Sequence, residues 1–292
     1  MPEEVIHYKE KEIEEILNSS NLSFDNLKYL ASEVAKNTWS PYSHFPVGAV
    51  VVGIDQSKKP KAFSGTNVEP TVHLNVCAER VAIYNGISAG YKRFIAVAIN
   101  LPKALKDPSK SDKENICKFT PCGACREVIL QKLDSKGIII IDGIDRTFTP
   151  KELLPHPILD INKLKTLTIE EMDALEKARK SLHNAHVPYT RDKYGVSLIA
   201  ENTNEIFSAC TLDSTAIGCS VEPLKAVFGS YAGSGNRKNK IKAIVFAYPF
   251  VKYPTGDTLQ LISDYCDSGT KIIIDNMGVT TIEELLPWAF KL

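Results

Sequence analysis

The order of apolar and polar positions along the chain predicts an α/β protein. Short apolar runs bounded by turn residues are typical of strands, whereas apolar residues spaced three and four apart are typical of helices. Strands are predicted over residues 47–53, 61–66, 94–100, 137–141, 196–200, 206–211, 241–247 and 271–275. Helices are predicted over about 77–89, 169–183 and 222–231, with one more before the last strand of each half. Alternation of strands with helices of this length indicates a layered α/β sheet.

The chain contains an internal repeat. Pro41-Tyr42-Ser43 is echoed by Pro188-Tyr189-Thr190, and Gly48 by Gly195, in both cases 147 positions later. Glu152-Leu153-Leu154-Pro155 recurs as Glu284-Leu285-Leu286-Pro287 after only 132 positions. The shorter offset implies that the second copy lacks about 15 residues.

The repeat predicts the domain organisation. Residues 1–24 are expected to form a helical extension, residues 25–158 a first domain, and residues 168–292 a second domain of the same fold. The polar stretch 101–118, rich in Lys, Asp, Ser and Pro, is expected to be an exposed loop that the second copy lacks.

The composition argues against several classes of binding partner and of protein. The 292 residues carry 35 basic and 35 acidic side chains, so the charge balance does not favour nucleic acid or an anionic membrane as a partner. The sequence has no apolar run near the roughly 20 residues that span a bilayer. The charged start of the chain does not resemble a secretory signal, and seven cysteines are too few for a disulfide scaffold. A cytoplasmic location is expected.

Two short motifs carry the candidate chemistry. The first is Cys77-Ala78-Glu79-Arg80, and the second is Pro121-Cys122-Gly123-Ala124-Cys125-Arg126. Cys77, Cys122 and Cys125 can bind zinc through three thiolates and leave a fourth position for water, as a catalytic site requires. Glu79 would lie close enough to move protons on that water. A structural zinc or plain buried thiols remain the alternative, although a structural site wants a fourth protein ligand.

Both motifs are expected to begin helices, whose N-termini favour thiolate over thiol. Three thiolates leave zinc with a net negative charge, which weakens it as a Lewis acid. Arg80 and Arg126 are therefore expected to hydrogen-bond the sulfur atoms and to withdraw part of that charge.

The second copy lacks these ligands. Glu222-Pro223-Leu224-Lys225 stands where the first copy has its Cys-Ala-Glu-Arg motif. Likewise, Pro254-Thr255-Gly256-Asp257-Thr258 stands in place of Pro-Cys-Gly-Ala-Cys. The C-terminal domain is expected to keep the fold without the metal, so that one Zn²⁺ binds per chain, in the N-terminal domain.

With these motifs in place, the chain resembles the cytidine deaminases, whose ligand set and non-ligand glutamate are general features of zinc deaminases. The resemblance extends to the segment from Ser40 to Ala49, to Gly65-x-Asn67-x-Glu69 and to Glu-Leu-Leu-Pro, and it covers nearly all of the first half. It implies a three-layer α/β/α fold with a mixed sheet, here duplicated. It also implies hydrolysis of cytidine and 2′-deoxycytidine to the uridine products and ammonia, in pyrimidine salvage.

The resemblance also assigns roles to residues. Cys77, Cys122 and Cys125 would bind zinc, Glu79 would move protons, and Asn67 and Glu69 would hydrogen-bond the ribose. Phe45 would pack by the base, with backbone groups of Ala78 and Thr120 contacting the pyrimidine. Phe45 could instead be a core residue, and Asn67 could be a turn residue.

The family further suggests an assembly. Its short members form tetramers with three cysteine ligands, so this two-domain chain is expected to be a homodimer that imitates a tetramer of single domains. In the short members an aromatic residue after Glu-Leu-Leu-Pro reaches a neighbouring active site, and Phe290 matches it whereas Ile158 does not. Two other functions stay open, a polynucleotide deaminase and a non-catalytic zinc-binding protein. The neutral charge disfavours the first and the presence of Glu79 the second.

Overall fold

The computed structural model describes residues 8–55, 57, 59–71, 74–104, 106–203, 205–235 and 240–291. It divides the chain into two compact units, residues 1–155 with 286–292, and residues 156–285. This differs from the predicted domains in two ways: the second unit begins at His156, and residues 286–291 pack with the first unit rather than with the second. The predicted N-terminal extension supplies α1 of the first unit.

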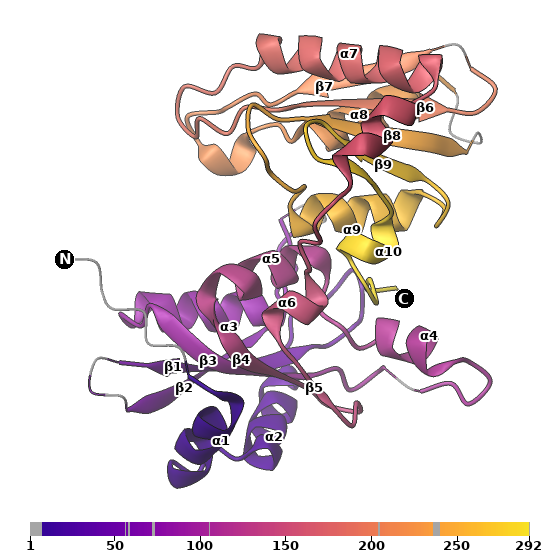
Figure 1. The fold of residues 1–292 in the computed structure, drawn as a ribbon. Coiled ribbons are helices and arrows are strands. Elements are labelled where there is room, and N and C mark those ends of the chain that lie inside the picture. Colours follow the sequence, from indigo (N-terminus) through magenta and orange to yellow (C-terminus); the bar gives the residue numbers. More distant parts are fainter. Residues whose placement is uncertain are drawn as a thin grey trace. The chain divides into compact units, whose positions relative to one another are not determined.

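The first unit contains one five-stranded mixed sheet with the order β2-β1-β3-β4-β5 (Figure 1). β3 and β4 are parallel, and the other neighbours are antiparallel. Its strands are β1 (Gly48–Ile54), β2 (Pro60–Thr66), β3 (Arg93–Asn100), β4 (Leu133–Ile141) and β5 (Thr147–Phe148). Its helices are α1 (Glu10–Ser19), α2 (Phe24–Ala35), α3 (Ala78–Ser88), α4 (Asp112–Cys117), α5 (Gly123–Lys132) and α6 (Pro150–Leu153).

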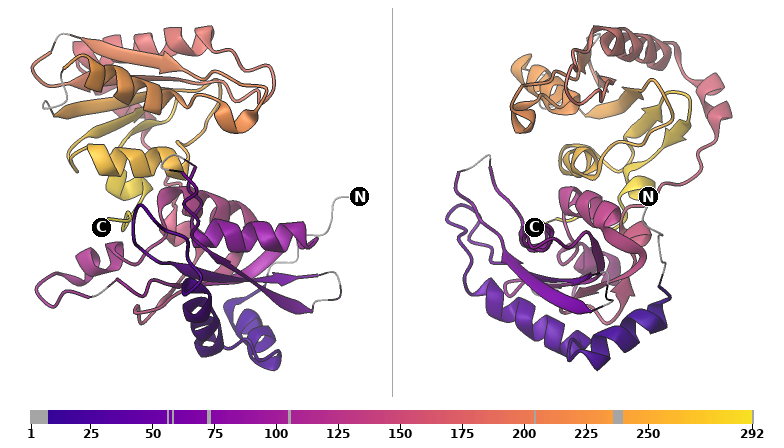
Figure 2. Two further views of the ribbon diagram at one scale, coloured as in Figure 1. Left: turned by 180° about the vertical axis from the view of Figure 1, so that it is seen from behind. Right: turned by 90° about the vertical axis from the view of Figure 1, so that its left-hand side faces the viewer.

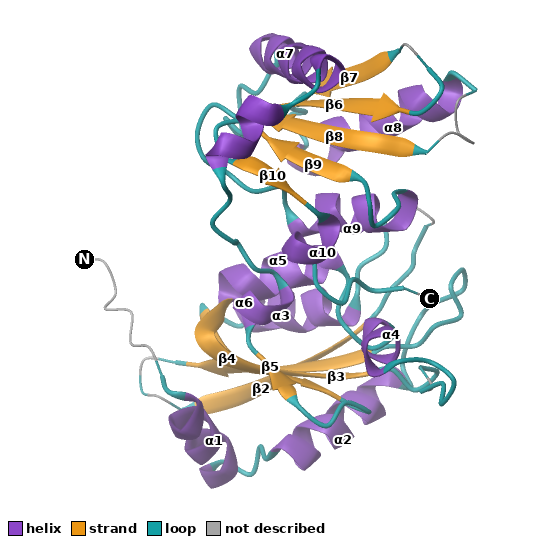
Figure 3. Ribbon diagram, turned by 45° about the vertical axis from the view of Figure 1, so that its right-hand side comes forward, coloured by secondary structure: helices purple, strands orange, loops and turns teal. Residues whose placement is uncertain are grey.

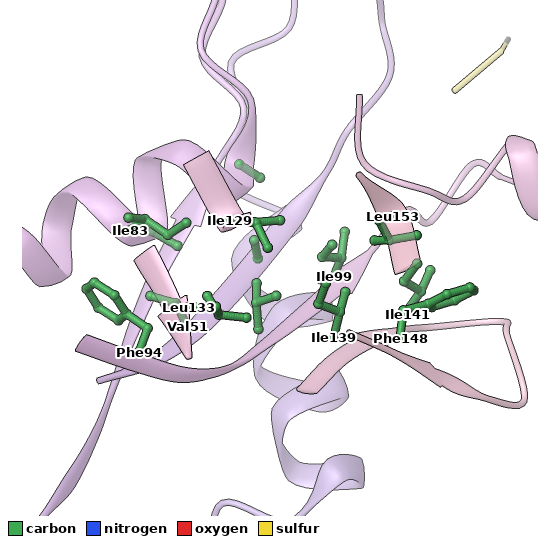
Figure 4. Close-up of a cluster of buried hydrophobic side chains, with 14 of the residues drawn as sticks. Val51, Ile83, Phe94, Ile99, Ile129, Leu133, Ile139, Ile141, Phe148 and Leu153 are labelled. Atoms are coloured by element: carbon green, nitrogen blue, oxygen red, sulfur yellow. The ribbon is translucent and has the colours of Figure 1, made fainter. Parts of the chain in front are cut away.

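Helices cover both faces of this sheet, α1 and α2 on one and α3, α5 and α6 on the other (Figures 2 and 3). Because side chains alternate along a strand, Val50 and Val52 of β1 pack with the core under α1 and α2. Val51 faces the opposite core, where Ile83 of α3 and Ile129 of α5 are fully buried (Figure 4). The first unit is therefore a three-layer α/β/α sandwich, as predicted.

The second unit repeats this topology. Its sheet has the order β7-β6-β8-β9-β10, and β8 and β9 are its parallel pair. The strands are β6 (Gly195–Ala200), β7 (Ile206–Cys210), β8 (Ile241–Ala247), β9 (Lys271–Ile274) and β10 (Gly278–Thr280). The helices are α7 (Ile169–Asn184), α8 (Pro223–Gly233), α9 (Gly256–Tyr265) and α10 (Ile282–Leu285), with 3-10 turns η1 (Ile161–Thr166) and η2 (Ile217–Cys219).

Local geometry supports the duplication. A Cβ on Gly48 would lie 2.0 Å from the carbonyl oxygen of Ala31 in α2, and a Cβ on Gly195 would lie 2.2 Å from that of Ala178 in α7. A helix therefore packs directly on the first residue of β1 in the first unit and of β6 in the second. Two further matched positions, His44 and Arg191, both have the left-handed φ, at 53° and 59°.

The predicted elements agree with these bounds to within a few residues, except that β4 begins at Leu133 rather than Gly137. The pattern missed β5 and β10, which are too short to show an alternation. The stretch 101–118 is not wholly a loop, because it contains α4, capped by Ser111. Twenty-two residues separate β3 from α5 in the first unit, whereas eight separate β8 from α9 in the second. This difference agrees with the prediction that the second copy lacks about 15 residues in this stretch. None of the described helices is long and apolar enough to cross a bilayer.

Candidate active site

Two helix N-termini bring the three cysteines together. Cys77 is the N-cap residue of α3, Cys122 is the N-cap residue of α5, and Cys125 lies in the first turn of α5. Both motifs therefore begin helices, as predicted. The approach of α3 to the sheet requires Gly65 in β2, where a Cβ would lie 2.3 Å from the backbone nitrogen of Ala82.

The three sulfur atoms fit a zinc ion. All lie within 4.8 Å of one another, with 3.7 Å between Cys77 and Cys122 and 3.6 Å between Cys122 and Cys125. A tetrahedron with Zn–S bonds of about 2.3 Å has edges of about 3.8 Å, so the spacing suits shared coordination. Thiolate sulfur is also a preferred zinc ligand. These cysteines are the one His/Cys/Asp/Glu cluster with metal-binding geometry among the described residues.

Arg80 lies beside this cluster as predicted. Its Nη2 is 3.6 Å from Sγ of Cys77 and 3.5 Å from the carbonyl oxygen of Asn75. Hydrogen bonds from Cys122 and Cys125, together with the charge of Arg80, lower the pKa of Cys77 well below its usual value. Arg80 therefore favours the thiolate form that a metal ligand needs.

Arg126 does not make the hydrogen bonds to sulfur that the sequence predicted. Its buried guanidinium donates to main-chain carbonyls, among them those of Pro121 and Leu153. Burial lowers its pKa to about 10, and the nearby charges of Cys122 and Cys117 oppose this shift. Its effect on the sulfur atoms is thus electrostatic, and its hydrogen bonds serve the backbone.

Glu79 is buried, with 4% of its surface exposed, at the second position of α3. Burial, reinforced by the negative charge of Cys77, raises its pKa to about 7. The Glu79 carboxyl can thus hold or release a proton near neutral pH, although a bound divalent cation would lower its pKa.

Cys77, Cys122 and Glu79 line a cavity of about 210 Å³, whereas Cys125 is buried behind them and is not among the described lining residues. Of the remaining predicted residues, Phe45, Asn67, Glu69, Thr120 and Phe290 line it. Ala78 is fully buried at the start of α3 and is not among the described lining residues. The lining also includes residues that were not predicted as site residues, namely Ser43, Val47, Asn75, Val76, Ile99, Leu101 and Phe119. Ile99 and Leu101 could have been inferred, because ligands in α/β folds bind beyond the carboxyl ends of strands.

Asn67 has a structural role as well as a place in the cavity. Its Oδ1 accepts hydrogen bonds from the amide of Val47 at 2.8 Å and from the hydroxyl of Thr38 at 3.2 Å. Its Nδ2 donates to the carbonyl oxygen of Phe45 at 3.0 Å. One proton on Nδ2 therefore remains for a ligand.

Glu69 holds the adjacent turn. Its Oε2 accepts from the amides of Tyr42 and Ser43, at 3.1 and 3.0 Å, and its Oε1 accepts from the Ser43 hydroxyl. Although burial opposes the charge, these hydrogen bonds lower the pKa of Glu69, so that it is a carboxylate at neutral pH. Oε1 keeps one lone pair with which to accept a hydrogen bond from a ligand.

Phe290 belongs to the first unit and lies beside Phe45. The two ring centroids are 6.4 Å apart with an interplanar angle of 61°, an edge-to-face arrangement. Two aromatic rings thus form part of the cavity wall, and one of them comes from the end of the chain.

In the second unit, the positions of the metal ligands hold a hydrogen-bonded network. Glu222 and Thr255 are the N-cap residues of α8 and α9, which match Cys77 and Cys122. Thr258, which matches Cys125, lies 2.9 Å from Thr255 and donates to Glu222 at 3.4 Å. Hydrogen bonds among the side chains of Glu222, Thr255 and Thr258 thus connect the N-termini of α8 and α9.

Aromatic rings take the place of cavity-lining residues in this unit. Tyr194 matches Val47, because each directly precedes the first glycine of its strand, Gly195 or Gly48. Tyr248 matches Leu101, because each directly follows the residue that pairs with that glycine, Ala247 or Asn100. The two rings are 5.2 Å apart, and the Tyr194 hydroxyl donates to Glu222 at 2.9 Å. The rings of Tyr194 and Tyr248, together with the hydrogen bond to Glu222, therefore occupy the position that corresponds to the active site.

Comparison with known proteins agrees with this geometry. Residues 25–141 match the family model described as the cytidine and deoxycytidylate deaminase zinc-binding region. The chain is 39% identical over 88 residues to a probable cytidine deaminase from Dictyostelium discoideum, which covers 30% of this chain and half of that protein. Over residues 25–141 the chain therefore resembles cytidine deaminases.

Other relatives extend the similarity along the chain. A cytidine deaminase from Vibrio vulnificus is 24% identical over 247 residues, which cover 80% of this chain and 76% of that protein. A crystal structure of cytidine deaminase from Burkholderia pseudomallei is 30% identical, with a TM-score of 0.37, and the match covers 45% of this chain and 95% of that one. The residues that match the family model include all three cysteines and Glu79.

Proposed function

We propose that this protein hydrolyses cytidine and 2′-deoxycytidine to uridine and 2′-deoxyuridine with release of ammonia, a reaction of pyrimidine salvage. The observation that carries this proposal is a single cavity whose lining combines Cys77 and Cys122 with the buried Glu79. The same lining contains a carboxylate and an amide, Glu69 and Asn67, with free hydrogen-bonding capacity. Such a site can bind a polar nucleoside and move protons on it.

Zinc held by Cys77, Cys122 and Cys125 would supply the acidity that makes hydroxide available at neutral pH. Glu79 takes one proton from the attacking water and passes it to N3 of the pyrimidine while the oxygen bonds to C4. It then carries the second proton to the exocyclic nitrogen, and the C4–N bond breaks to release ammonia. Water thus provides the oxygen of the product and both transferred protons.

The charges of the cavity favour a nucleoside over a nucleotide. Glu69 and Glu79 are its acidic groups, and no Lys, Arg or His is among the described lining residues. A 5′-phosphate would therefore enter an acidic cavity without a cation to bind it.

We assign the sugar to Asn67 and Glu69, and the base to the space between Phe45, Phe290 and Glu79. The remaining Nδ2 proton of Asn67 and the remaining lone pair of Glu69 match one hydroxyl group, which both accepts and donates. The 3′-hydroxyl is the group we propose, and the backbone of Thr120 and Ala78 would contact the pyrimidine.

This assignment predicts a specific substrate defect. Removal of the 3′-hydroxyl, in 3′-deoxycytidine, should raise KM or lower kcat/KM by about 10- to 100-fold, because two buried polar groups lose their partner. The matched control is 2′-deoxycytidine, which should be used within a few-fold of cytidine. Equal kcat/KM for all three nucleosides would contradict the role of Asn67 and Glu69.

The proposed function itself is tested by following the ultraviolet absorbance of cytidine with the purified protein, with zinc content measured on the same sample. Cytidine and 2′-deoxycytidine should be converted, whereas cytidine 5′-monophosphate should react far more slowly. Untouched cytidine in a zinc-loaded protein would refute the proposal. Turnover of a cytosine-containing oligonucleotide instead would identify a polynucleotide deaminase.

We further infer one zinc ion per chain, in the first unit, because Glu222, Thr255 and Thr258 replace the ligands in the second. A cytoplasmic location suits the seven cysteines, which are free thiols. We also infer a homodimer, by fold analogy and from exposed apolar side chains such as Trp39 and Tyr189, which are 62% and 54% exposed. Sedimentation at the mass of a single 32.3 kDa chain would refute the dimer.

A further inference from the structure

We propose that Arg126 is a positioning residue that holds the end of the chain so that Phe290 completes the wall of the nucleoside cavity. Residues 286–291 are called the C-terminal strap. The inference rests on the proposed function only for its effect on kinetics. The anchoring of the strap is a property of the fold and can be measured without substrate.

The hydrogen bonds of Arg126 connect the zinc-site helix to the strap. Its side chain is 1% exposed, directly after Cys125 in α5. Nη1 donates to the carbonyl oxygens of Leu153, at 2.8 Å, and Pro287, at 2.5 Å. Nη2 donates to that of Trp288, also at 2.5 Å. One guanidinium thus joins α5, the end of α6 and the strap.

Other contacts hold the same segment on both sides of Phe290. The Thr120 hydroxyl donates to the carbonyl oxygen of Trp288 at 2.7 Å, and the amide of Lys291 donates to that of Cys117 at 3.3 Å. The ring of Trp288 lies edge-to-face on Phe148, 5.8 Å between centroids. The strap is therefore docked at Trp288, two residues before the ring that enters the cavity, and at Lys291, directly after it.

The backbone at Trp288 explains why strong anchors are needed. Its φ is 50°, in the left-handed region that an aromatic residue rarely adopts. Such a conformation persists only where surrounding contacts determine it. The carbonyl of Trp288 accepts hydrogen bonds from both Arg126 and Thr120, so these two donors fix the peptide that turns the chain toward Phe290.

An arginine suits this position better than a lysine. The acceptors come from several segments, and a planar guanidinium can donate to them at once in fixed directions. A lysine would keep the positive charge beside the cysteines but has a single nitrogen. Substitution by lysine therefore separates the geometric role of Arg126 from its charge.

The second unit offers an internal comparison. Leu259 is the fourth residue of α9, as Arg126 is the fourth residue of α5. The residue that follows Glu-Leu-Leu-Pro at the position of Phe290 is Ile158, which is fully exposed to solvent. There His156 stacks on Tyr253 at 4.6 Å instead. The arginine and the inserted aromatic ring are thus present together in one unit and absent together in the other.

The chain contains two tryptophans, so a Trp39→Phe background leaves Trp288 as a reporter of the strap. Acrylamide quenching of Trp288 should increase about two- to threefold when Arg126→Lys is added, because the strap loosens. In the same pair of proteins KM for cytidine should rise about tenfold with kcat changed much less, since a wall of the binding site is displaced before chemistry. Zinc content should stay the same.

The matched control is Arg179→Lys, which alters an exposed arginine paired with Asp275 in the second unit and should change neither readout. Phe290→Ala supplies the second half of a double-mutant cycle. If Arg126 acts through Phe290, the double variant should have the KM of Phe290→Ala alone.

Unchanged quenching of Trp288 in the Arg126→Lys protein would overturn the inference, as would additive effects on KM in the cycle. Failure of the native protein to convert cytidine would instead refute the proposed function, and the quenching comparison would still decide whether Arg126 holds the strap. The two failures are therefore distinguishable.

Discussion

Replacement of Glu79 by Gln should lower kcat for cytidine by about 10³-fold and leave bound zinc unchanged. Glutamine has nearly the same shape and fills the same buried site at the start of α3, so the cysteine cluster is not disturbed. It cannot accept a proton from water or deliver one to N3 of the base. The expected loss therefore falls on the chemical step, and KM should change little.

The control for this variant is Glu222→Gln, because Glu222 is also partly buried at a helix start but lies in the second unit. That variant should deaminate cytidine at the normal rate. The assay pairs the absorbance of cytidine with a zinc determination on each protein. Retention of more than about a tenth of kcat by Glu79→Gln would rule out its role as the proton carrier.

Replacement of Cys122 by Ser should abolish both zinc binding and deamination. Cys122 lies 3.7 Å from Cys77 and 3.6 Å from Cys125, between the other two sulfur atoms. A hydroxyl is a far poorer zinc ligand than a thiolate, so we expect zinc affinity to fall by more than about 100-fold. Zinc titration against a competing chelator measures the affinity, and cytidine turnover at saturating zinc measures the activity.

Cys117→Ser is the matched control, because Cys117 is five residues from Cys122 and is not part of the cluster. It should keep zinc and activity. If Cys117→Ser lost zinc as Cys122→Ser does, a fourth protein ligand would be indicated and the site would be structural rather than catalytic. Normal activity of Cys122→Ser would exclude the cysteine cluster from the reaction.

Glu69 combines a structural role in the first unit with its proposed role in ligand binding. Glu69 holds the turn at Tyr42 and Ser43, and Asp213 accepts the same set of hydrogen bonds from Tyr189 and Thr190 in the second unit. The second unit has no zinc ligands at the matching positions, so this interaction belongs to the fold. Only the unused capacity of Glu69 can serve a ligand, which is why the test of its role relies on a modified substrate rather than on substitution.

The sequence by itself determined the local features of this protein. Apolar periodicity located most of the strands and helices, since it reports which face of each element is buried. The repeat of Gly48 at Gly195 predicted two units of one fold, and the spacing of Cys77, Cys122 and Cys125 predicted a shared cluster. The replacements at Glu222 and Thr255 showed which unit lacks the metal ligands. Each of these signals can be read from residue types and their spacing along the chain, without knowing which segments pack together.

Only the tertiary structure decided which distant segments meet. Arg126 was expected to hydrogen-bond the sulfur atoms but donates to carbonyls as far away in sequence as Pro287 and Trp288. Residues 286–291 were assigned to the second domain but pack with the first unit. Main-chain acceptors have no residue-specific signal, and the packing of a short segment depends on the shape of the surface that receives it. The resemblance matched Phe290 to an aromatic residue that enters a neighbouring active site, but only the fold placed it beside Phe45 within the first unit.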